Sequence, residues 1–403
     1  MNLKRLLRKA LHGLLVCAAL TLSSHAWAPP AIMAGVSDAG PDATIALILR
    51  DIEENKLDVA LARTENLTRL HPNFRLAHLI RGDLLLARAQ PLQTLGNVAN
   101  APAGQLQDLR AEAVARLHGY LQRPAGNTVP RYLLQLRPEQ AFAVVVDTRQ
   151  SRLYLYRNNN GTPSFVADWY VSQGRGGSAK QREGDLKTPL GVYHVTSVLP
   201  REKLTDYYGS RAFPINYPNE WDRMQGRTGY GIWLHGVPSD TYARAPLASE
   251  GCVVLSNEDL DTLTSYVQVG VTPVIISHGV EWASFEEWNK ERNALNAAVE
   301  QWRQDWASRD TERYLSHYSS RFRSGKTDIA AWRAQKAAVN ASKTWIEVEL
   351  GGLSMLRSPG EDELMMVSFE QDYRSNNLNN RMHKRQFWIL EDGRWKIIYE
   401  GAA

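Results

Sequence analysis

The chain has 403 residues, of which 43% are hydrophobic and 22% are charged, and it contains 12 tryptophans. This composition excludes an intrinsically disordered chain and predicts two or three packed domains. The formal net charge of +4 is spread along the chain without a long basic block. We therefore do not expect nucleic acid as a partner.

Residues 1–28 predict a removable secretory signal. A basic stretch, MNLKRLLRK, precedes an apolar run over residues 14–22, and Ala26-Trp27-Ala28 gives the small-x-small end of a cleavage site. The apolar run is shorter than the roughly 20 residues that a membrane-spanning helix needs, and no later segment is long and apolar enough. We expect an exported protein with no transmembrane segment after signal cleavage.

The chain contains only two cysteines, Cys17 and Cys252. Cys17 lies in the apolar run, where the bulky Val16 disfavours lipoprotein processing, and signal cleavage would remove it. The mature chain would keep only Cys252, in the stretch LASEGCVVLSN, and would have no internal disulfide. Cys252 is then either a reactive thiol, an intermolecular partner or a buried inert cysteine.

Residues 41–122 predict a helical N-terminal segment. Isoleucine and leucine recur at helical spacing over residues 45–70, and His71-Pro72-Asn73 separates this run from a second one over residues 76–84. A third helix is predicted over residues 106–121. The pairing around Pro72 resembles one tetratricopeptide-type hairpin, which cannot bury its apolar face alone. We favour a structural or dimerising cap over a peptide receptor.

The middle of the chain predicts a β-rich domain. Pro124, Pro130 and Pro138 indicate a linker, and Asn158-Asn159-Asn160-Gly161 indicates a turn. Short apolar or alternating runs predict strands over residues 141–147, 153–156, 165–172, 191–197, 231–235, 252–255 and 272–277.

Residues 290–403 predict an α+β domain. Helical periodicity returns from about residue 281, a second helix is predicted over 328–340, and strands follow over 345–350, 364–373, 384–390 and 395–399. The closing hairpin FWILEDGRWKIIYEG, with the helices before it, resembles the nuclear transport factor 2-like (SnoaL-like) cone fold. We expect its polar residues Asp310, His317 and His383 to be structural or solvated rather than catalytic.

A nucleophilic cysteine needs a base or a cation beside it, because a thiol pKa of roughly 8.5 leaves little thiolate at neutral pH. His235 precedes Cys252 by 17 positions and ends a predicted strand. We expect a hydrogen bond between the two that favours a thiolate–imidazolium pair. Gly251 allows close backbone approach, and amides near Gly251 and Cys252 are candidate oxyanion donors. We expect no metal site, because no CxxC or HExxH spacing is present.

The motifs over residues 139–278 together resemble the L,D-transpeptidase catalytic domain of the YkuD family. The matching residues are Val146-Asp147, VSQG at 171–174, Lys180, EGD at 183–185, Thr188-Pro189 with Gly191, His235-Gly236 and Ser249-x-Gly251-Cys252. The resemblance implies a mostly β sandwich in which Cys252 is the nucleophile and His235 its base, with a backbone carbonyl orienting the histidine. It places Gly251 and Gly236 at the oxyanion site and implies no cofactor.

The resemblance also implies a reaction. The thiolate would attack the carbonyl of meso-diaminopimelate in a peptidoglycan stem peptide, expel the terminal D-alanine and leave an acyl-enzyme. An amine acceptor would then give transpeptidation, and water would give L,D-carboxypeptidase activity. Glu250 and Val254 stand where the family commonly has His and Arg, and loss of that Arg favours hydrolysis. Ser249, Tyr230 and Arg244 are candidate substrate-binding residues, with Arg244 a substitute cation.

Four interpretations concern the whole chain. The order of helical segment, YkuD-like domain and cone-like domain is similar to the cell-shape L,D-carboxypeptidases of curved and helical bacteria, which implies the periplasm, peptidoglycan stem peptides and a homodimer through the N-terminal helices. The altered motif also resembles an amidase that releases peptidoglycan-linked lipoprotein. The remaining alternatives are a non-catalytic wall-binding scaffold and a catalytic C-terminal domain that uses Asp310 or His383. We expect Glu183 and Asp185 to form a structural loop and Trp233 to pack the sheet.

Overall fold

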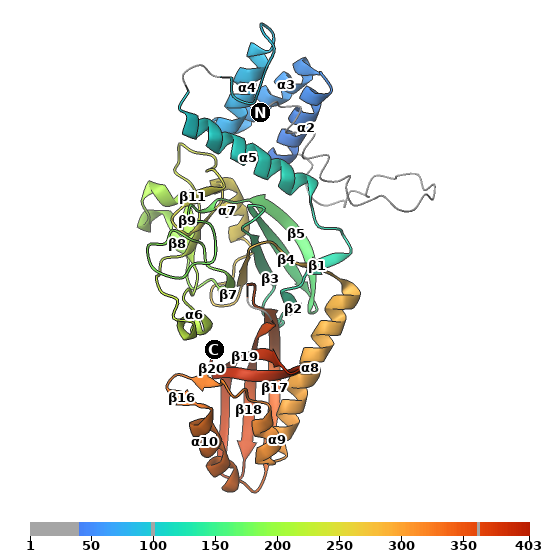
Figure 1. Cartoon of the computed structure of the whole chain (residues 1–403), viewed down its shortest axis with the longest axis vertical. Coiled ribbons are helices and arrows are strands. Elements are labelled where there is room, and N and C mark those ends of the chain that lie inside the picture. The colour runs from blue at the N-terminus through green and yellow to red at the C-terminus, as the bar shows by residue number, and fades with distance from the viewer. Residues whose placement is uncertain (1–39, 98–100, 361–362) are drawn as a thin grey trace, which may run out of the picture.

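The computed structural model describes residues 40–97, 101–360 and 363–403, so the predicted signal over residues 1–28 and Cys17 lie outside the described residues. The described chain is elongated, with a helical domain, a β-rich domain and an α+β domain following one another along the long axis (Figure 1). This confirms the predicted multidomain class.

Between residues 40 and 121, leaving aside 98–100, the structure describes four helices where the sequence pattern predicted three. They are α2 (Pro41–Glu53), α3 (Leu57–Leu70), α4 (Arg75–Leu86) and α5 (Ala103–Leu121). The extra break falls at Asn55, whose φ of 58° is the left-handed conformation that asparagine tolerates. The apolar faces of the four helices meet in one core, and α5 lies between the other helices and the middle domain (Figure 1).

The predicted linker around Pro130 is instead built into two sheets. Strand β1 (Thr128–Pro130) pairs with β14 (Trp282–Ser284), and β2 (Leu133–Gln135) pairs with β17 (Ile346–Arg357) of the C-terminal domain. Proline is tolerated at the end of so short a strand. The pattern was misread because runs of three residues are too short to show alternation. As a result, the segment before the middle domain contributes an edge strand to the last domain.

The middle domain is the predicted β sandwich, with two main sheets packed on a shared apolar core. The five-stranded sheet has the order β5-β4-β3-β13-β7, and the four-stranded sheet has the order β12-β10-β9-β8. The strands of the first are β3 (Phe142–Asp147), β4 (Arg152–Asn159), β5 (Thr162–Tyr170), β7 (Gly191–His194) and β13 (Pro273–Ser277). Those of the second are β8 (Leu199–Pro200), β9 (Arg211–Pro214), β10 (Trp233–His235) and β12 (Val253–Val254). Shorter elements connect them: β6 (Gln173–Gly174), β11 (Leu247–Ser249), α6 (Glu220–Met224) and α7 (Asn257–Thr264).

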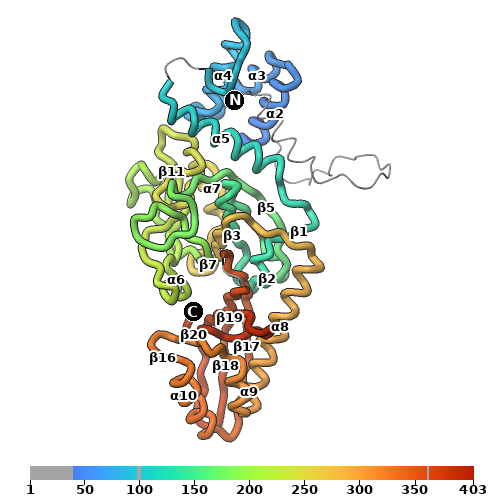
Figure 2. The backbone as a smooth tube through the Cα atoms, viewed as in Figure 1, coloured from blue at the N-terminus to red at the C-terminus, as the bar shows by residue number. Residues whose placement is uncertain are grey.

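The C-terminal domain packs helices on one curved antiparallel sheet of order β2-β17-β18-β19-β20. Its remaining elements are α8 (Phe285–Ala307), α9 (Thr311–Ser316), β15 (Arg323–Ser324), β16 (Thr327–Asp328), α10 (Ile329–Ala341), β18 (Leu364–Ser375), β19 (Leu378–Glu391) and β20 (Arg394–Ala402). The predicted hairpin forms at Asp392 and Gly393, whose φ values of 51° and 73° suit a primed turn. Helix α8 runs from the middle domain along the side of the last one (Figure 2).

Buried charges join the helical domain to the sandwich. Asp42 of α2 forms ion pairs with both Arg116 of α5 and Arg152 of β4, and Arg152 also pairs with Asp168 of β5. The Arg116 guanidinium lies 4.1 Å from the centre of the Tyr170 ring. Removing one partner of such a buried network leaves an uncompensated charge, which is strongly destabilising. The helical domain is therefore held against β4 and β5.

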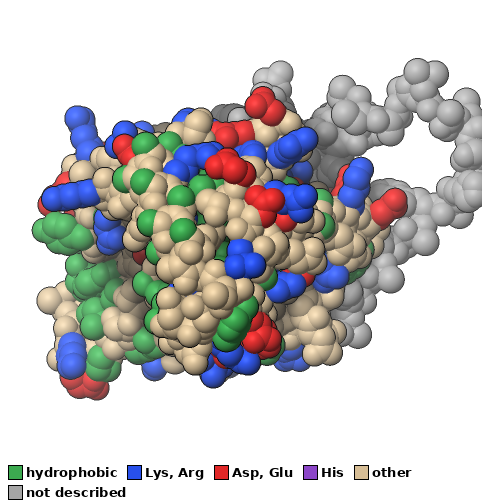
Figure 3. All heavy atoms as spheres, turned by 90° about the horizontal axis from the view of Figure 1, so that it is seen from below, with side chains coloured by type: hydrophobic (Ala, Val, Ile, Leu, Met, Phe, Trp, Pro, Cys, Tyr) green, Lys and Arg blue, Asp and Glu red, His purple; other side chains and the backbone are tan. Residues whose placement is uncertain are grey.

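The surface gives two further observations. Acidic and basic side chains are interspersed on the face seen from the C-terminal end (Figure 3). Within the part of the chain that the structure describes, no helix combines the length and apolar character needed to cross a membrane.

Candidate active site

The candidate site lies on two neighbouring parallel strands of the second sheet. Strand β12 pairs in parallel with β10, with Leu234 opposite Val253 and His235 opposite Val254. Cys252 directly precedes β12 and is half-buried, whereas the side chain of His235 is only 1% exposed. The fold thus places the two residues that the sequence motifs singled out on neighbouring strands, with Cys252 before the start of β12 and His235 at the end of β10.

Ser249 shapes the loop that carries the thiol. Its hydroxyl donates to the carbonyl oxygen of Cys252 at 2.6 Å and accepts from the amide of Gly251 at 3.1 Å. Gly251 has a φ of 131°, and a Cβ there would lie 2.8 Å from the carbonyl oxygen of Lys187. Only glycine fits this position without strain. Because the Gly251 amide already donates to the Ser249 hydroxyl, it is not free to donate to an oxyanion as we expected. Ser249 instead fixes the conformation of the loop.

The thiol of Cys252 faces the backbone of the neighbouring loop. Its Sγ donates to the carbonyl oxygen of Gly231 at 3.4 Å. Burial raises the thiol pKa to about 11, and a backbone hydrogen bond from Trp233 and the positive charge of Arg244 only partly oppose this rise. At neutral pH the resting residue is therefore a protonated thiol.

The ring of His235 is oriented by a backbone carbonyl. Nδ1 lies 2.7 Å from the carbonyl oxygen of Gly236. A carbonyl only accepts, so Nδ1 carries the proton of the neutral ring and Nε2 keeps its lone pair. Burial lowers the histidine pKa to about 4, with a smaller lowering contribution from Arg244. The ring is therefore neutral at neutral pH and can accept a proton at Nε2.

These pKa shifts correct the expected ion pair. With the pKa of Cys252 near 11 and that of His235 near 4, both the thiol and the imidazole are neutral in the resting state. The physical cause is burial, which penalises both charged forms. The thiol also bonds the carbonyl of Gly231 instead of the imidazole. A proton transfer between the two residues would have to accompany attack on a substrate rather than precede it.

Asn257 is a site residue that sequence reasoning missed. Its Oδ1 accepts from the amides of Ser210 at 3.1 Å and Val237 at 3.2 Å. A Cβ on Gly236 would lie only 2.0 Å from this oxygen, so glycine leaves room for the amide. The Gly236 amide itself donates to the carbonyl oxygen of Tyr208 at 2.9 Å, which differs from the oxyanion role that we expected. The sequence feature that could have indicated this residue is the pair Ser256-Asn257, which follows the cysteine motif. Ser256 also caps α7.

Two consecutive tyrosines and an arginine form a wall beside the histidine. The ring centres of Tyr208 and Tyr207 lie 5.1 Å and 6.2 Å from that of His235. The Arg244 guanidinium lies 4.2 Å from the centre of the Tyr207 ring and donates to the Tyr207 carbonyl oxygen at 2.9 Å. Arg244 therefore lies beside the site, whereas Tyr230, expected with it, is 77% exposed. The tyrosine pair follows no chemical motif, so the sequence did not reveal it.

The EGD loop has the structural role that we expected. The buried Lys180 ammonium pairs with Asp185 at 2.7 Å, and Asp185 also accepts from the amides of Gln181 and Lys187 at 2.8 Å and 3.2 Å. The pKa of Asp185 is lowered to about 2, because these donors outweigh its burial. Glu183 is exposed. The loop thus holds a buried cation whose charge lowers the pKa of Cys252.

The residues of the altered motif are both accounted for. Glu250 is exposed and forms an ion pair with the exposed Arg175 at 3.2 Å. A solvated charge pair such as Glu250–Arg175 contributes little to stability. Val254 is 2% exposed and lies opposite His235 on the paired strand. The cations beside the thiol loop are therefore supplied from elsewhere in the chain.

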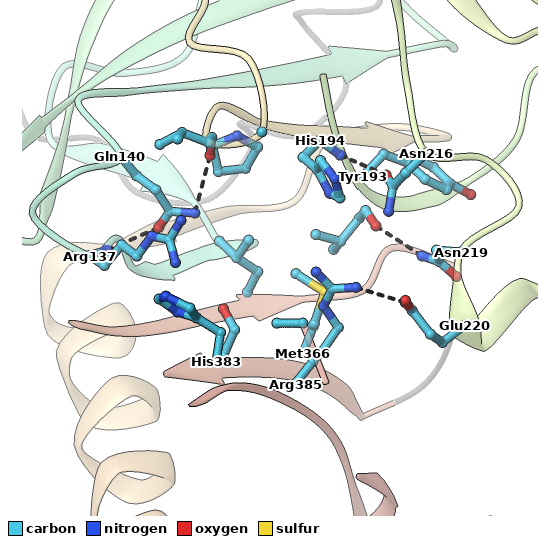
Figure 4. Close-up of a pocket in the computed structure, with 17 residues that line it drawn as sticks. Arg137, Gln140, Tyr193, His194, Asn216, Asn219, Glu220, Met366, His383 and Arg385 are labelled. Carbon is cyan, nitrogen blue, oxygen red and sulfur yellow. Dashed lines mark hydrogen bonds and ion pairs between the residues drawn. The ribbon is translucent and has the colours of Figure 1, made fainter. Parts of the chain in front are cut away.

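The polar residues singled out in the C-terminal domain occupy separate places. Asp310 caps α9 by accepting from the amide of Arg313 at 3.0 Å, and His317 Nε2 lies 2.7 Å from Asp305. His383 lines a cavity of about 290 Å³ between the middle and last domains (Figure 4). In that cavity Arg385 pairs with Glu220 at 2.8 Å. The structure does not bring these three residues together.

Comparison with known protein families matches two parts of the chain. Residues 141–276 match the L,D-transpeptidase catalytic domain, YkuD, and residues 294–401 match the Cds6 C-terminal NTF2-like domain. YafK of Escherichia coli K12, provisionally designated an L,D-transpeptidase, is 32% identical over 88 residues, which is 22% of this chain. The match spans only 31% of the length of YafK.

Two solved structures resemble a larger part of the chain. Bd1075 from Bdellovibrio bacteriovorus is 28% identical with a TM-score of 0.61, and the match covers 68% of this chain and 98% of that one. Pgp2 from Campylobacter jejuni, a helical cell shape determining protein, is 26% identical with a TM-score of 0.58, covering 67% of this chain and 95% of that one. The chain therefore carries an L,D-transpeptidase catalytic domain of the YkuD family, followed by an NTF2-like C-terminal domain.

Proposed function

We propose that this protein is an exported cysteine enzyme that modifies peptidoglycan by acting at the meso-diaminopimelate–D-alanine bond of stem peptides. The observation that carries the proposal is that a YkuD domain places Cys252 directly before β12 and His235 at the end of the paired strand β10, with Nδ1 of His235 held by a backbone carbonyl so that Nε2 keeps its lone pair. No charged group of the C-terminal domain is needed for this chemistry.

The first chemical step follows from the protonation states. As Sγ of Cys252 attacks the carbonyl carbon of diaminopimelate, Nε2 of His235 takes the thiol proton, and a tetrahedral intermediate forms. The C–N bond to D-alanine then breaks, and the imidazolium returns its proton to the leaving amine. The products of this half-reaction are a thioester on Cys252, free D-alanine and a neutral imidazole.

The developing oxyanion needs a donor that is not already bonded. The amides of Gly251 and Gly236 are bonded to Ser249 and Tyr208. The amide of Cys252 itself has no hydrogen-bond acceptor among residues 40–97, 101–360 and 363–403. We assign it as the oxyanion donor, since a preorganised backbone N–H aimed at the new charge is the usual source of this stabilisation.

Water completes the reaction in our proposal, which makes the protein an L,D-carboxypeptidase. His235 deprotonates the water, which attacks the thioester and releases the diaminopimelate carboxylate and the Cys252 thiol. Val254, where the transpeptidase motif has an arginine, is buried and provides no cation for anchoring an acceptor strand. The likeness to a protein that determines helical cell shape supports a role in cell shape. The setting would be the periplasm, and a homodimer would form through the N-terminal helices.

Digestion of purified muropeptides followed by mass spectrometry tests the function. The mature protein should remove one D-alanine from tetrapeptide stems without forming dimers, and Cys252→Ala and His235→Ala should each abolish this. His383→Ala is the matched control, because it removes a histidine of the C-terminal domain. Activity that survives Cys252→Ala but not His383→Ala would contradict the proposal and favour a catalytic C-terminal domain.

Two other outcomes of the same digestion correspond to the alternatives. New diaminopimelate-to-diaminopimelate dimers would identify a transpeptidase. Release of peptide-linked lipoprotein from sacculi, with no change in free tetrapeptides, would identify the lipoprotein-releasing amidase. A wild-type protein that binds sacculi but matches Cys252→Ala in every digest would identify a non-catalytic scaffold.

A further inference from the structure

A cavity of about 410 Å³ lies between the helical domain and the candidate active site. One wall comes from α4 and α5 and includes Arg75 and Asp108. The opposite wall comes from the sandwich and includes Tyr207, Arg244 and Ala248, the residue before Ser249. The cavity therefore joins the N-terminal helices to the loop that carries the thiol.

Two residues belong both to this cavity and to the surroundings of His235. The Tyr207 ring lies 6.2 Å from the His235 ring, centre to centre. Arg244 stacks on Tyr207 at 4.2 Å and lowers the pKa values of both His235 and Cys252 through its charge. A group bound in the cavity would thus contact Tyr207 and Arg244, the two residues that the cavity shares with the surroundings of His235.

The helical wall is firmly held. Phe74 packs on Tyr242 of the sandwich with ring centres 4.4 Å apart, and Arg116 lies over Phe74 at 4.9 Å. Glu112, which also lines the cavity, is bonded to Arg116 at 2.8 Å. The buried pairing of Arg116 with Asp42 fixes the same helix. The cavity is therefore preformed rather than dependent on a mobile loop.

Opposite charges face this cavity without neutralising each other. Neither Arg75 nor Asp108 forms an ion pair within 4.0 Å with any residue of the described ranges. Arg244 uses one nitrogen for the Tyr207 carbonyl, and its other donors have no hydrogen-bond acceptor among the residues that the structure describes. A ligand that carries both an ammonium and a carboxylate would form charge-assisted hydrogen bonds with both walls of the cavity. Such hydrogen bonds are stronger than those between neutral groups.

We infer that this cavity binds the zwitterionic D-centre of meso-diaminopimelate. Asp108 accepts the ammonium group, and Arg75 and Arg244 hold the carboxylate from opposite walls. The inference rests on the proposed function, in which the L-centre carbonyl of the same residue is attacked by Cys252. A short methylene chain joins the two centres, so one residue would occupy both sites. The helical domain is then part of the substrate site as well as a cap.

Selectivity for the third residue of the stem follows from this arrangement. A stem with L-lysine at that position offers an ammonium but no carboxylate, so Arg75 and Arg244 would lose their partner. The wild type should therefore prefer a diaminopimelate stem to a lysine stem. Arg75→Gln should reduce that preference about five- to tenfold, through KM rather than kcat, since a uniform binding contact is lost.

The first test uses full-length mature protein and two synthetic tetrapeptide stems, with diaminopimelate or lysine at the third position. Asp108→Asn should raise KM for both stems about five- to tenfold, as expected for one lost ammonium contact. Arg50→Gln is the matched control, because Arg50 is an exposed arginine on α2 that does not line the cavity. If Arg75→Gln keeps the full preference of the wild type while turnover is intact, the inference is wrong and the proposed function stands.

A second test does not depend on turnover. Free meso-diaminopimelate is titrated into the Cys252→Ala protein by calorimetry, and Asp108→Asn or Arg75→Gln in that background should weaken binding about tenfold. If binding requires both Asp108 and Arg75 but the protein with Cys252 intact hydrolyses neither stem, the cavity assignment is upheld and the proposed reaction is contradicted. Absence of binding, or binding unaffected by either variant, would overturn the inference.

Discussion

Asn257 holds the backbone of Val237 through both atoms of its side-chain amide. Oδ1 accepts from the Val237 amide at 3.2 Å, and Nδ2 donates to the Val237 carbonyl oxygen at 2.9 Å. Because Val237 follows the Gly236 carbonyl that orients His235, this pair of bonds fixes the carbonyl that selects the histidine tautomer. The first helix after the cysteine motif thereby positions the proposed base.

Replacing Asn257 should therefore impair catalysis more than binding. In Asn257→Ala the amides of Ser210 and Val237 lose their acceptor, so the His235 loop loosens, and we expect kcat to fall about tenfold or more with KM nearly unchanged. The loss of stability should be about 1–2 kcal/mol in urea unfolding, as for unpaired half-buried backbone groups. Asn66→Ala on α3 is the matched control. A proportional rise in KM would mean that Asn257 contacts substrate instead.

The pH dependence of kcat/KM should show an unusually low acid limb. Only the neutral ring of His235 can accept the thiol proton, so activity is lost as pH falls through its pKa of about 4. Activity should persist on the alkaline side until the thiol pKa of about 11. Arg244→Gln removes a charge that lowers the histidine pKa, so it should move the acid limb upward. An acid limb near 6.5, the ordinary histidine pKa, would contradict the buried neutral pair.

A side chain at Gly251 should disturb the thiol loop. In Gly251→Ala the new Cβ would meet the Lys187 carbonyl oxygen at 2.8 Å in a backbone conformation with φ of 131°. We expect a loss of about 1–3 kcal/mol in stability, as for a strained backbone site, and slower turnover. Chemical denaturation and muropeptide kinetics measure the two effects. Gly161→Ala, in a hairpin turn with open space around the glycine, is the control for left-handed strain alone. Equal effects in both variants would argue against the close approach at Gly251.

Breaking the Lys180–Asp185 pair should destabilise the catalytic domain. Asp185→Asn leaves the Lys180 ammonium buried without its carboxylate, at a cost of about 3 kcal/mol by comparison with other buried pairs. Since the folded-state pKa of Asp185 is lowered to about 2, the pair stabilises the wild type above the unfolded pKa and this contribution disappears as pH falls through 2. Urea unfolding at neutral and acidic pH measures it. A difference between wild type and variant that stays constant down to pH 2 would contradict this assignment.

The sequence predicted those parts of the fold that long, regular patterns specify. Alternating runs revealed the strands around Val144 and Leu155, and Asp392-Gly393 revealed the last hairpin. Short elements escaped notice, because a three-residue strand such as β2 has no period and depends on a partner more than 200 residues away in the chain. The break at Asn55 was missed because apolar spacing continues across it.

The candidate site was predictable where chemistry requires particular residue types. Cysteine, histidine and glycine in a fixed order pointed to the thiol loop and to the proposed base. The protonation states were not predictable, because they depend on burial that only packing creates. Asn257, Tyr207 and the cavity residue Asp108 were missed for a related reason: each acts by its place in space, and none belongs to a motif with a spacing of its own.

Capture of the acyl-enzyme tests the central claim most directly. A tetrapeptide muropeptide is mixed with the mature protein, the reaction is quenched in acid within a few seconds, and the intact and proteolysed protein is weighed by mass spectrometry. The account predicts that the tripeptide muropeptide, less one water, is attached to the peptide containing Cys252 and that Cys252→Ala shows no adduct. Release of D-alanine by Cys252→Ala at the wild-type rate would contradict the account.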